Sequence, residues 1–285
     1  MRARSIHMIM SAIGWNLFII STIALVLHFY SFLITNTDKD DRQTFAKNIK
    51  RMVQALDKPD IYKVAIIDYV SRNSKINQIV SISDEFGFNF SEVDLSNVDL
   101  KHVSMRGINF SNAKLDVSSF IHADMTGVDL SNSSMEGALL NHTIINRAIL
   151  KNANLRLSDL REALLINSNL SGANLQGADL SRANLSGVDL SNADLTNANL
   201  TEVNLDHATL HATILKGANC EGASFYNASI KNSNLSGSNF TKARFIDSKL
   251  HNNAIASSNF EYSDFRGAML KDNDIGKIYA KNIKR

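Results

Sequence analysis

Cysteine and proline are almost missing from this 285-residue chain, which contains one of each. The single cysteine, Cys220, excludes an intramolecular disulfide and any cysteine-based metal cluster. The single proline is Pro59, so the long segment from residue 90 onward keeps every backbone N–H that β-ladders need. The chain also lacks a glycine-rich phosphate loop and the motifs G-x-S-x-G, H-E-x-x-H and C-x-x-C. The common nucleotide-binding, hydrolase and metalloprotease chemistries are therefore not indicated.

A strong charge of one sign is missing as well. The 30 lysines and arginines nearly balance the 28 aspartates and glutamates, which gives a formal net charge of +2. Residues 1–89 carry +3, residues 90–275 carry −5 and residues 276–285 carry +4. A mildly acidic surface of this kind is ordinarily just solvated, so nucleic acid is not expected as a partner.

What the chain does have is a strict period of five. Every fifth residue from Phe90 to Ile275 is apolar, with no insertion or deletion, and we call these residues the centres. The residue two before each centre is small or β-branched with few exceptions, as Ala173 is before Leu175. Such a period fits neither a helix, with about 3.6 residues per turn, nor a flat strand, with a repeat of about 2. A fixed self-similar repeat indicates a solenoid.

The central run ANLQGADLSRANLSGVDLSNADLTNANLTEVNL, from Ala173 to Leu205, resembles the pentapeptide-repeat family, whose motif is A-(D/N)-L-x-x. The resemblance implies an all-β solenoid: a right-handed, four-sided parallel β-helix in which four pentapeptides form one coil. In that fold the centre and the residue two before it point inward, and the other three positions face solvent. Characterised relatives include DNA mimics that protect type II topoisomerases, bacterial effectors and membrane-anchored proteins.

This coil predicts which side chains stack, because residues 20 apart lie above one another at about 4.8 Å. One inward column then runs from Phe90 and Phe110 through Leu190 to Leu270. A second ends in three phenylalanines beside two more in the neighbouring column, so we expect aromatic packing among Phe225, Phe245, Phe265, Phe240 and Phe260. Two inward residues per side fill the interior and leave no cavity for a substrate. We therefore predict no enzyme activity and no cofactor, and we expect Cys220 to be a small buried hydrophobe.

Residues 12–34 form an apolar stretch without formal charge, which as a helix would span about 34 Å against a bilayer core of about 30 Å. Trp15 and Tyr30 near its ends suit the two membrane interfaces. The stretch is longer than the core of a signal peptide and no A-x-A-like site follows, which favours an uncleaved anchor over a cleaved signal. We expect residues 1–36 to be a single-pass membrane anchor.

The side of the membrane on which the repeat lies is weakly determined. Arg2 and Arg4 precede the apolar stretch, and three acids with two bases follow it in TNTDKDDR. This asymmetry favours an N-terminus in the cytoplasm and a repeat on the other side, although Lys47 and Lys50 soon reduce it.

Residues 37–85 are predicted to be a helical stalk or cap. Thr37 and Asp40 resemble a capping box, and Pro59 starts a second helix. A cap is favoured over a partner-binding helical hairpin because the end of a solenoid exposes open strand edges. The β-helix is assigned to residues 86–276. The basic tail, 277–285, would close the last coil by default, or else dimerise end to end or touch anionic lipid headgroups.

Three outward histidines, His102, His122 and His142, are spaced by 20 and should stack on one face. They are candidates for a divalent metal site or a pH-sensitive strip. The first carboxylate in their column is Glu162, so a solvated ladder is the favoured interpretation and no metal is predicted.

Six apolar residues occupy outward positions within two coils. A contiguous apolar group marks a contact site for a protein partner or a second copy, against an incidental patch or one covered by the N-terminal helices. These candidates are Leu139, Ile144, Ile149, Leu157, Leu164 and Ile166. The column Asn199, Asn219, Asn239 and Asn259 is expected to be structural, with amides bonded from coil to coil.

These observations favour a non-enzymatic, membrane-anchored scaffold that binds an unidentified protein. One alternative is a DNA-mimic modulator of a type II topoisomerase, a role that requires a strongly acidic, dimeric, soluble rod. The other is a secreted bacterial effector whose apolar N-terminus inserts into host membranes.

Overall fold

The computed structural model describes residues 90–273 and residue 284. The chain divides into two units, Met1–Asn89 and Phe90–Arg285, and every described residue belongs to the second. The predicted anchor at 1–36 and the predicted helical cap at 37–85 lie outside the described residues. Among those that are described, no helix is long and apolar enough to cross a membrane.

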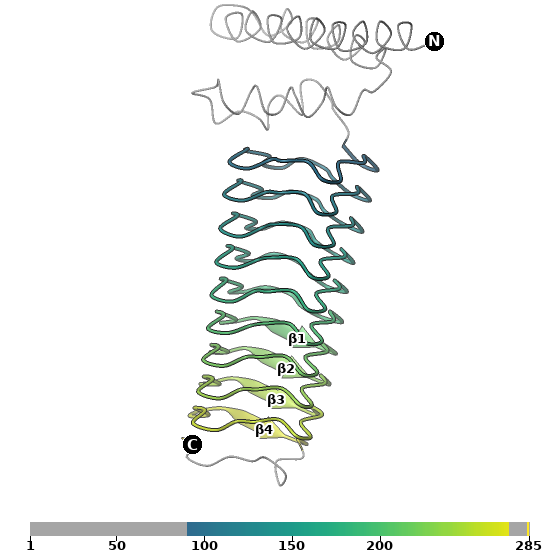
Figure 1. The fold of residues 1–285 in the computed structure, drawn as a ribbon. Helices are drawn as coiled ribbons and strands as arrows, with labels where there is room; N and C mark the ends of the chain where they lie inside the picture. The colour runs from purple at the N-terminus through teal and green to yellow at the C-terminus, as the bar shows by residue number, and fades with distance from the viewer. Residues whose placement is uncertain (1–89, 274–283, 285) are drawn as a thin grey trace, which may run out of the picture. The chain divides into compact units, whose positions relative to one another are not determined.

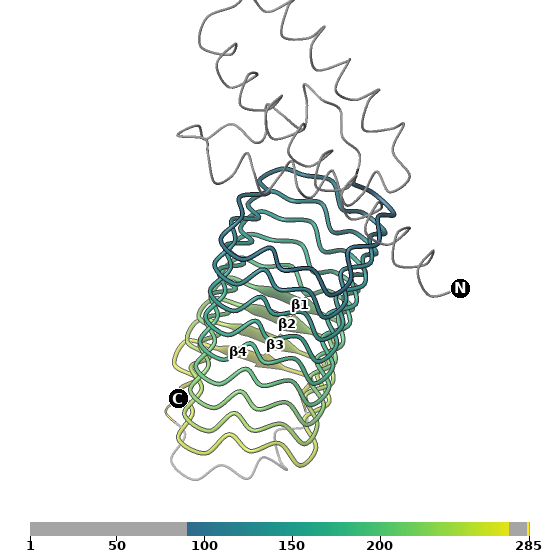
Figure 2. The same cartoon turned by 45° about the horizontal axis from the view of Figure 1, so that its top comes forward.

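The second unit is a stack of coils, each 20 residues long (Figure 1). Parallel bridges join residues 20 apart along the whole stack, from Asp94 with Lys114 to Asn239 with Asn259. Figure 2 shows the same coils tilted toward the viewer as closed loops on a common axis. The right-handed parallel β-helix and its 20-residue register, both expected from the period of five, are confirmed.

Backbone bonds between coils use three of the five N–H groups in each pentapeptide. The N–H of a centre donates to the carbonyl 19 residues later, as Leu155 does to Asn174 at 2.7 Å. The N–H before a centre donates to the preceding coil, and the N–H two after a centre donates to the following coil, both at about 2.9 Å. A fourth N–H, three after the centre, donates back to the centre's own carbonyl and closes the corner, as Ser158 does to Leu155 at 3.2 Å.

The fifth N–H of the pentapeptide belongs to the residue directly after the centre, and it explains why aspartate or asparagine precedes so many centres. The side-chain oxygen of that aspartate or asparagine accepts the N–H of the residue two positions later, as Asp189 does from Ser191 at 2.9 Å. This Asx turn leaves no N–H of the pentapeptide without a partner. Where an apolar residue precedes the centre, the preceding coil can supply the acceptor oxygen. Leu164 precedes the centre Leu165, and Asn146 Oδ1 accepts the N–H of Ile166 at 2.8 Å.

Each corner contains one left-handed residue, two positions after the centre. Every such residue from 92 to 272 has a positive φ. Glycine adopts this conformation without strain, as at Gly172 (φ 70°), and asparagine tolerates it, as at Asn152 (φ 57°). Val117 (φ 57°) is strained there because its β-branched side chain disfavours positive φ.

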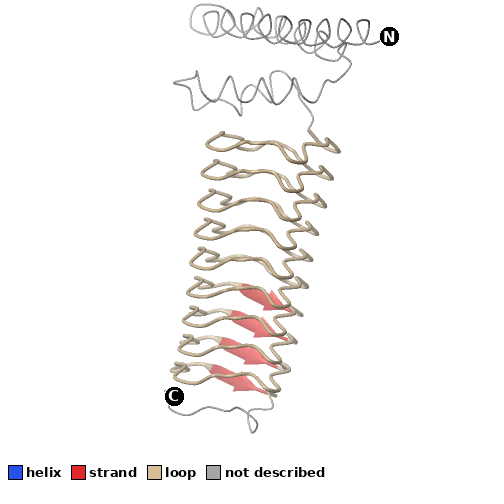
Figure 3. Cartoon of the chain, in the orientation of Figure 1, coloured by secondary structure: helices blue, strands red, loops and turns tan. Residues whose placement is uncertain are grey.

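Four strands occur on one side of the lower coils and appear red in Figure 3. They form one parallel sheet in sequential order. The strands are β1 (Thr209–His211), β2 (Ser229–Lys231), β3 (Lys249–His251) and β4 (Met269–Lys271).

Buried polar side chains open the corner that follows each of the first three strands. The hydroxyl of Ser233 donates to Leu210 O at 2.8 Å and accepts the N–H of Thr213 at 3.1 Å, so it stands in place of the usual corner bond. Asn253 and Asn273 insert their amides into the next two corners in the same way. Three residues per strand pair between the coils at this side.

The interior is filled, as predicted. The centres between Leu130 and Leu215 are 0 % exposed. Phe245 stacks between Phe225 and Phe265, with ring centroids 4.8 and 4.7 Å away, and this confirms the expected aromatic packing. Cys220 is 0 % exposed and its burial raises the pKa of the thiol, as expected for a buried hydrophobe.

The lower end of the predicted inward column needs a correction. Leu270 is 38 % exposed because it lies in β4, which pairs only with β3 within the described part of the chain. Ile275, the last predicted centre, lies outside that part.

Residue 284, which the sequence assigned to the basic tail, continues the 20-residue register. Lys284 bridges Asp264, its N–H donates to Ser263 O at 3.2 Å and its carbonyl accepts the N–H of Phe265 at 2.8 Å. This pairing agrees with a tail that closes the last coil, rather than one that leaves the rod.

Candidate functional site

The outer walls carry the polar groups that are free to interact, because the buried ones are used. Buried hydroxyls donate to backbone carbonyls, as Thr143 does to Phe120 O at 2.7 Å and Ser168 to Ile145 O at 2.6 Å. In residues 90–273 and 284, the one buried side-chain N or O atom without a hydrogen-bond partner is Ser119 Oγ. It belongs to an outward column in which Ser119 bridges Leu139.

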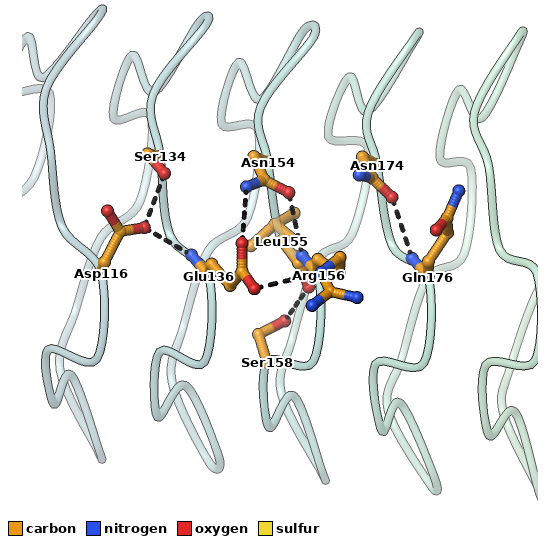
Figure 4. Close-up of polar contacts among 9 residues, drawn as sticks. All are labelled: Asp116, Ser134, Glu136, Asn154, Leu155, Arg156, Ser158, Asn174 and Gln176. Atoms are coloured by element: carbon orange, nitrogen blue, oxygen red, sulfur yellow. Dashed lines mark hydrogen bonds and ion pairs between the residues drawn. The ribbon is translucent and has the colours of Figure 1, made fainter.

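One wall shows how the outward polar columns are connected (Figure 4). Asp116 Oδ1 accepts from the Ser134 hydroxyl at 2.6 Å and from the N–H of Glu136 at 2.8 Å. Glu136 in turn accepts from Arg156 Nε at 3.1 Å and from Asn154 Nδ2 at 3.4 Å. This network links three coils, but its ion pair is solvent-exposed and contributes about 1 kcal/mol or less.

The repeated aspartates brace corners and do not form acid–base pairs. Arg161 donates to both carboxylate oxygens of Asp159, at 2.8 and 2.7 Å, and these hydrogen bonds lower the carboxyl pKa of Asp159. Arg266 does the same for Asp264. A general acid needs a raised pKa, and these two arginine-paired carboxyls have the opposite shift.

The three predicted histidines stack, as expected. The ring centroids of His102 and His122 are 5.1 Å apart, those of His122 and His142 are 4.9 Å apart, and the ring planes lie within 13° of parallel. His142 Nδ1 lies 3.3 Å from Glu162 Oε2, and Arg182 pairs with the same carboxylate at 2.8 Å.

This stacking does not suit metal binding. Nitrogen lone pairs lie in the ring planes, so those of parallel rings point alongside one another instead of converging on a tetrahedral ion. Among the residues that the structure describes, no group of three histidine, cysteine or acidic side chains could hold a metal. The geometry favours the solvated ladder.

The six apolar candidates do not form one surface. Ile144 bridges Leu164, and Ile166 comes directly after the centre Leu165, at the start of the corner that ends this side. Leu139 and Ile149 belong to the two adjoining sides, and Leu157 (54 % exposed) occupies a corner. Each step of five residues crosses a corner, so the candidates are spread over adjoining sides, and their role as a contact site stays a prediction. The part that shares one side is Ile144, Leu164 and Ile166, which we call the apolar trio.

The predicted asparagine column is bonded from coil to coil, but only some contacts join amide to amide. Asn239 Nδ2 donates to Asn219 Oδ1 at 3.0 Å. Asn219 and Asn259 instead donate to threonine hydroxyls at 3.0 Å, those of Thr201 and Thr241. A threonine two residues after one ladder asparagine therefore accepts the amide of the next asparagine in the column, 18 residues further on.

Sequence reasoning missed a basic surface on the four-stranded sheet. The outward residues after the centres of β1 to β4 are His211, Lys231, His251 and Lys271, which pair in register, and Lys249 precedes the centre of β3. We call these five residues the basic sheet face. The signal was a column of four basic residues spaced by 20, which was visible in the sequence.

Comparison with known proteins agrees with this geometry. The family model described as pentapeptide repeats matches eight copies, and the matched segments together cover residues 89–252, more than half of the chain. A search of curated proteins found no match.

Two similar solved structures are pentapeptide-type solenoids. QnrB1, a plasmid-mediated fluoroquinolone resistance protein, is 23% identical, with 65% of this chain and 92% of that chain covered and a TM-score of 0.50. HetL, a pentapeptide repeat protein involved in heterocyst differentiation regulation from the cyanobacterium Nostoc sp. strain PCC 7120, is 28% identical, with coverages of 70% and 98% and a TM-score of 0.35. At this identity, the likeness to QnrB1 shows the fold alone.

Proposed function

The chain belongs to the pentapeptide-repeat family, and we propose that it is a non-enzymatic scaffold, anchored in a membrane, that binds a protein on its outer walls. The observation that carries this proposal is the filled interior. Centres such as Leu150 and the small residues between them, such as Ala178, are fully buried. A substrate could not be desolvated inside such a rod, so recognition must use the repeated outer walls.

The anchor part of the proposal is supported by the apolar stretch 12–34, which lies outside the described residues. The test is a carbonate wash of membranes that contain the full-length protein, together with reporter fusions at Lys39 and Arg285. We expect the protein to stay in the membrane pellet and the double variant Ile20→Asp, Leu25→Asp to be released. Release of the wild-type protein would contradict the anchor, and the two reporters would identify the side of the membrane that holds the rod.

The binding part is supported by the apolar trio, in which Leu164 is exposed and Ile144 and Ile166 are half-buried, since apolar groups gathered on one side of a rod favour a protein contact. A photo-crosslinking residue at Ile144 should give one discrete adduct in cells, and the same residue at Asn169, on an adjoining side, should give none. An adduct of twice the mass of the chain would indicate a homodimer. Absence of an adduct at Ile144, or the same adducts at both positions, would contradict a binding role for this side.

The charge pattern favours the scaffold over the DNA-mimic alternative. A mimic requires a continuous acidic wall, whereas many carboxylates here are paired with basic side chains, as Glu162 is with Arg182. One side of the rod is basic, with Lys231 and Lys271 exposed. Inhibition of gyrase supercoiling by the purified protein would favour the mimic instead. The effector alternative depends on residues outside the described range, and secretion assays would test it.

A further inference from the structure

We propose that the basic sheet face docks against an anionic lipid bilayer, with its lysines on headgroup phosphates. The inference goes beyond the anchor at 12–34, because it concerns a separate contact made by the wall of the rod. It rests on three features of the sheet: unmatched positive charge, a flat display of that charge, and an exposed apolar side chain at one end.

The lysines of this sheet are unmatched, whereas several basic residues on the other walls are paired. Arg156, Arg161 and Arg266 each have a carboxylate within 3.1 Å. Lys231 and Lys249 have no ion pair with any described residue, and neither does Lys271. In the basic sheet face, only His251 has a carboxylate neighbour, Asp272 at 3.5 Å.

The sheet displays this charge as a regular array. In-register pairing places Lys231 beside His251 and His251 beside Lys271, on strands about 4.8 Å apart. The three lysines lie on the neighbouring strands β2, β3 and β4 and repel one another, so the array is disfavoured unless an anion lies against it. The outward neighbours in the other column are Thr209 and Ser229, and neither supplies a negative charge.

An exposed apolar side chain at the end of the array favours lipid as the anionic partner. Met269 is 63 % exposed and lies in β4 on the same outward face as Lys271. Lysines next to exposed apolar groups are typical of protein surfaces that sit at the headgroup level of anionic membranes.

Two other polyanionic partners fit less well. The array contains no arginine and no tyrosine, phenylalanine or tryptophan, the side chains that bind phosphates bidentately or stack on nucleic-acid bases. A second copy offers no matching acidic wall, because carboxylates without an ion pair are spread around the rod, as Asp179, Asp189 and Asp194 on three different sides illustrate.

The test places one fluorophore within the array of the full-length protein. Ser229→Cys puts an exposed thiol in the column of Lys249, two residues before Lys231, and the buried Cys220 should not react with the label. The labelled protein is combined with vesicles of phosphatidylcholine alone or with three-tenths phosphatidylserine, each carrying nitroxide headgroup quenchers. Thr241→Cys, on the opposite side of the rod, is the matched label position.

We expect quenching at residue 229 in the anionic vesicles only, weakened by added salt, and none at residue 241. Each lysine near an anionic surface raises the equilibrium constant for membrane binding by a factor of about five. The triple variant Lys231→Gln, Lys249→Gln, Lys271→Gln should therefore lower the binding constant of the sheet for anionic vesicles roughly a hundred-fold. A control triple variant, Arg147→Gln, Lys216→Gln, Arg244→Gln, changes net charge equally at unpaired basic residues elsewhere. It should keep the quenching.

Equal quenching in neutral vesicles, equal loss in both triple variants, or no quenching at residue 229 would overturn the proposal. Binding of duplex DNA that is lost in the first triple variant, without quenching by vesicles, would assign the surface to nucleic acid instead. Melting temperatures of the variants show whether the rod is folded. The readout is separate from the carbonate wash, because quenching at residue 229 reports contact of the sheet and the wash reports insertion of residues 12–34.

Discussion

Two glycines with the same backbone conformation allow the stacking of coils to be tested quantitatively. Gly127 and Gly172 both have φ +70°, so alanine at either position suffers the same left-handed strain. A Cβ at residue 127 would have nothing within 4 Å, whereas a Cβ at residue 172 would overlap Oδ1 of Asn152 in the preceding coil. The difference between the two variants therefore isolates the contact between coils.

The expected magnitudes follow from these two terms. Left-handed strain costs about 1 kcal/mol for alanine, which sets the loss for Gly127→Ala. Gly172→Ala also forces the Asn152 amide to move and breaks its bond to Asn132 Oδ1, which is 3.2 Å long. Displacing a packed side chain typically costs about 1–3 kcal/mol, so the total loss for Gly172→Ala should be about 2–4 kcal/mol.

The assay is urea unfolding of each variant, followed by far-ultraviolet circular dichroism. The double variant Asn152→Gly, Gly172→Ala removes the obstructing amide and should recover the additional loss, leaving a cost near that of Gly127→Ala. Equal losses for the two single variants, or no recovery in the double variant, would refute the coil-on-coil contact described for these residues.

Other substitutions and conditions test the core, the thiol, the corner aspartates and the histidines. Phe245→Ala should destabilise the rod by about 3–5 kcal/mol, because the ring stacks between two others. Tyr262→Ala, at an exposed position, should change stability little. Similar losses of unfolding free energy in the two variants, measured in urea, would contradict the aromatic core. Cys220 should resist thiol reagents in the native state and react only on unfolding, because burial raises its pKa, and fast native labelling would show an open interior. The hydrogen bonds from Arg266 lower the carboxyl pKa of Asp264. The stability that this pair contributes is therefore complete above the ordinary aspartate pKa of about 4 and is lost as pH falls through the lower pKa of the folded state. Arg266→Ala should weaken this loss of stability at acid pH, and an unchanged dependence of stability on pH would contradict the pairing. Zn²⁺ should leave the melting temperature unchanged in the wild type and in His122→Ala, and a rise in the wild type alone would restore the metal hypothesis.

The period of five was enough to predict the coil, the inward columns and the stacked phenylalanines and histidines. Each of these depends only on counting in steps of five and 20, which the sequence preserves without interruption. The same arithmetic predicted that Ile144 would lie against Leu164. It also misled where corners matter: Leu139 and Ile149 are near Ile144 in the sequence but lie on other sides of the rod.

The polar details could not be read from the sequence in the same way. The hydroxyl of Ser233 opens a corner 20 residues earlier, and nothing near Leu210 or Thr213 in the sequence announces it. An aspartate before a centre accepts the N–H of the residue two positions later, and this role can be seen only when the turn geometry is known as well as the residue type. The basic sheet face is hard to see in the sequence because its members are separated by about 20 residues and each one alone is an ordinary surface residue.

The claim that the interior is filled, and that only the outer walls can interact, is tested most directly by diffraction from crystals of the protein under xenon pressure. A rod packed by fully buried centres such as Leu150 and Leu190 should show no xenon between coils. Xenon bound along the axis of the rod would reveal an interior cavity and contradict this account.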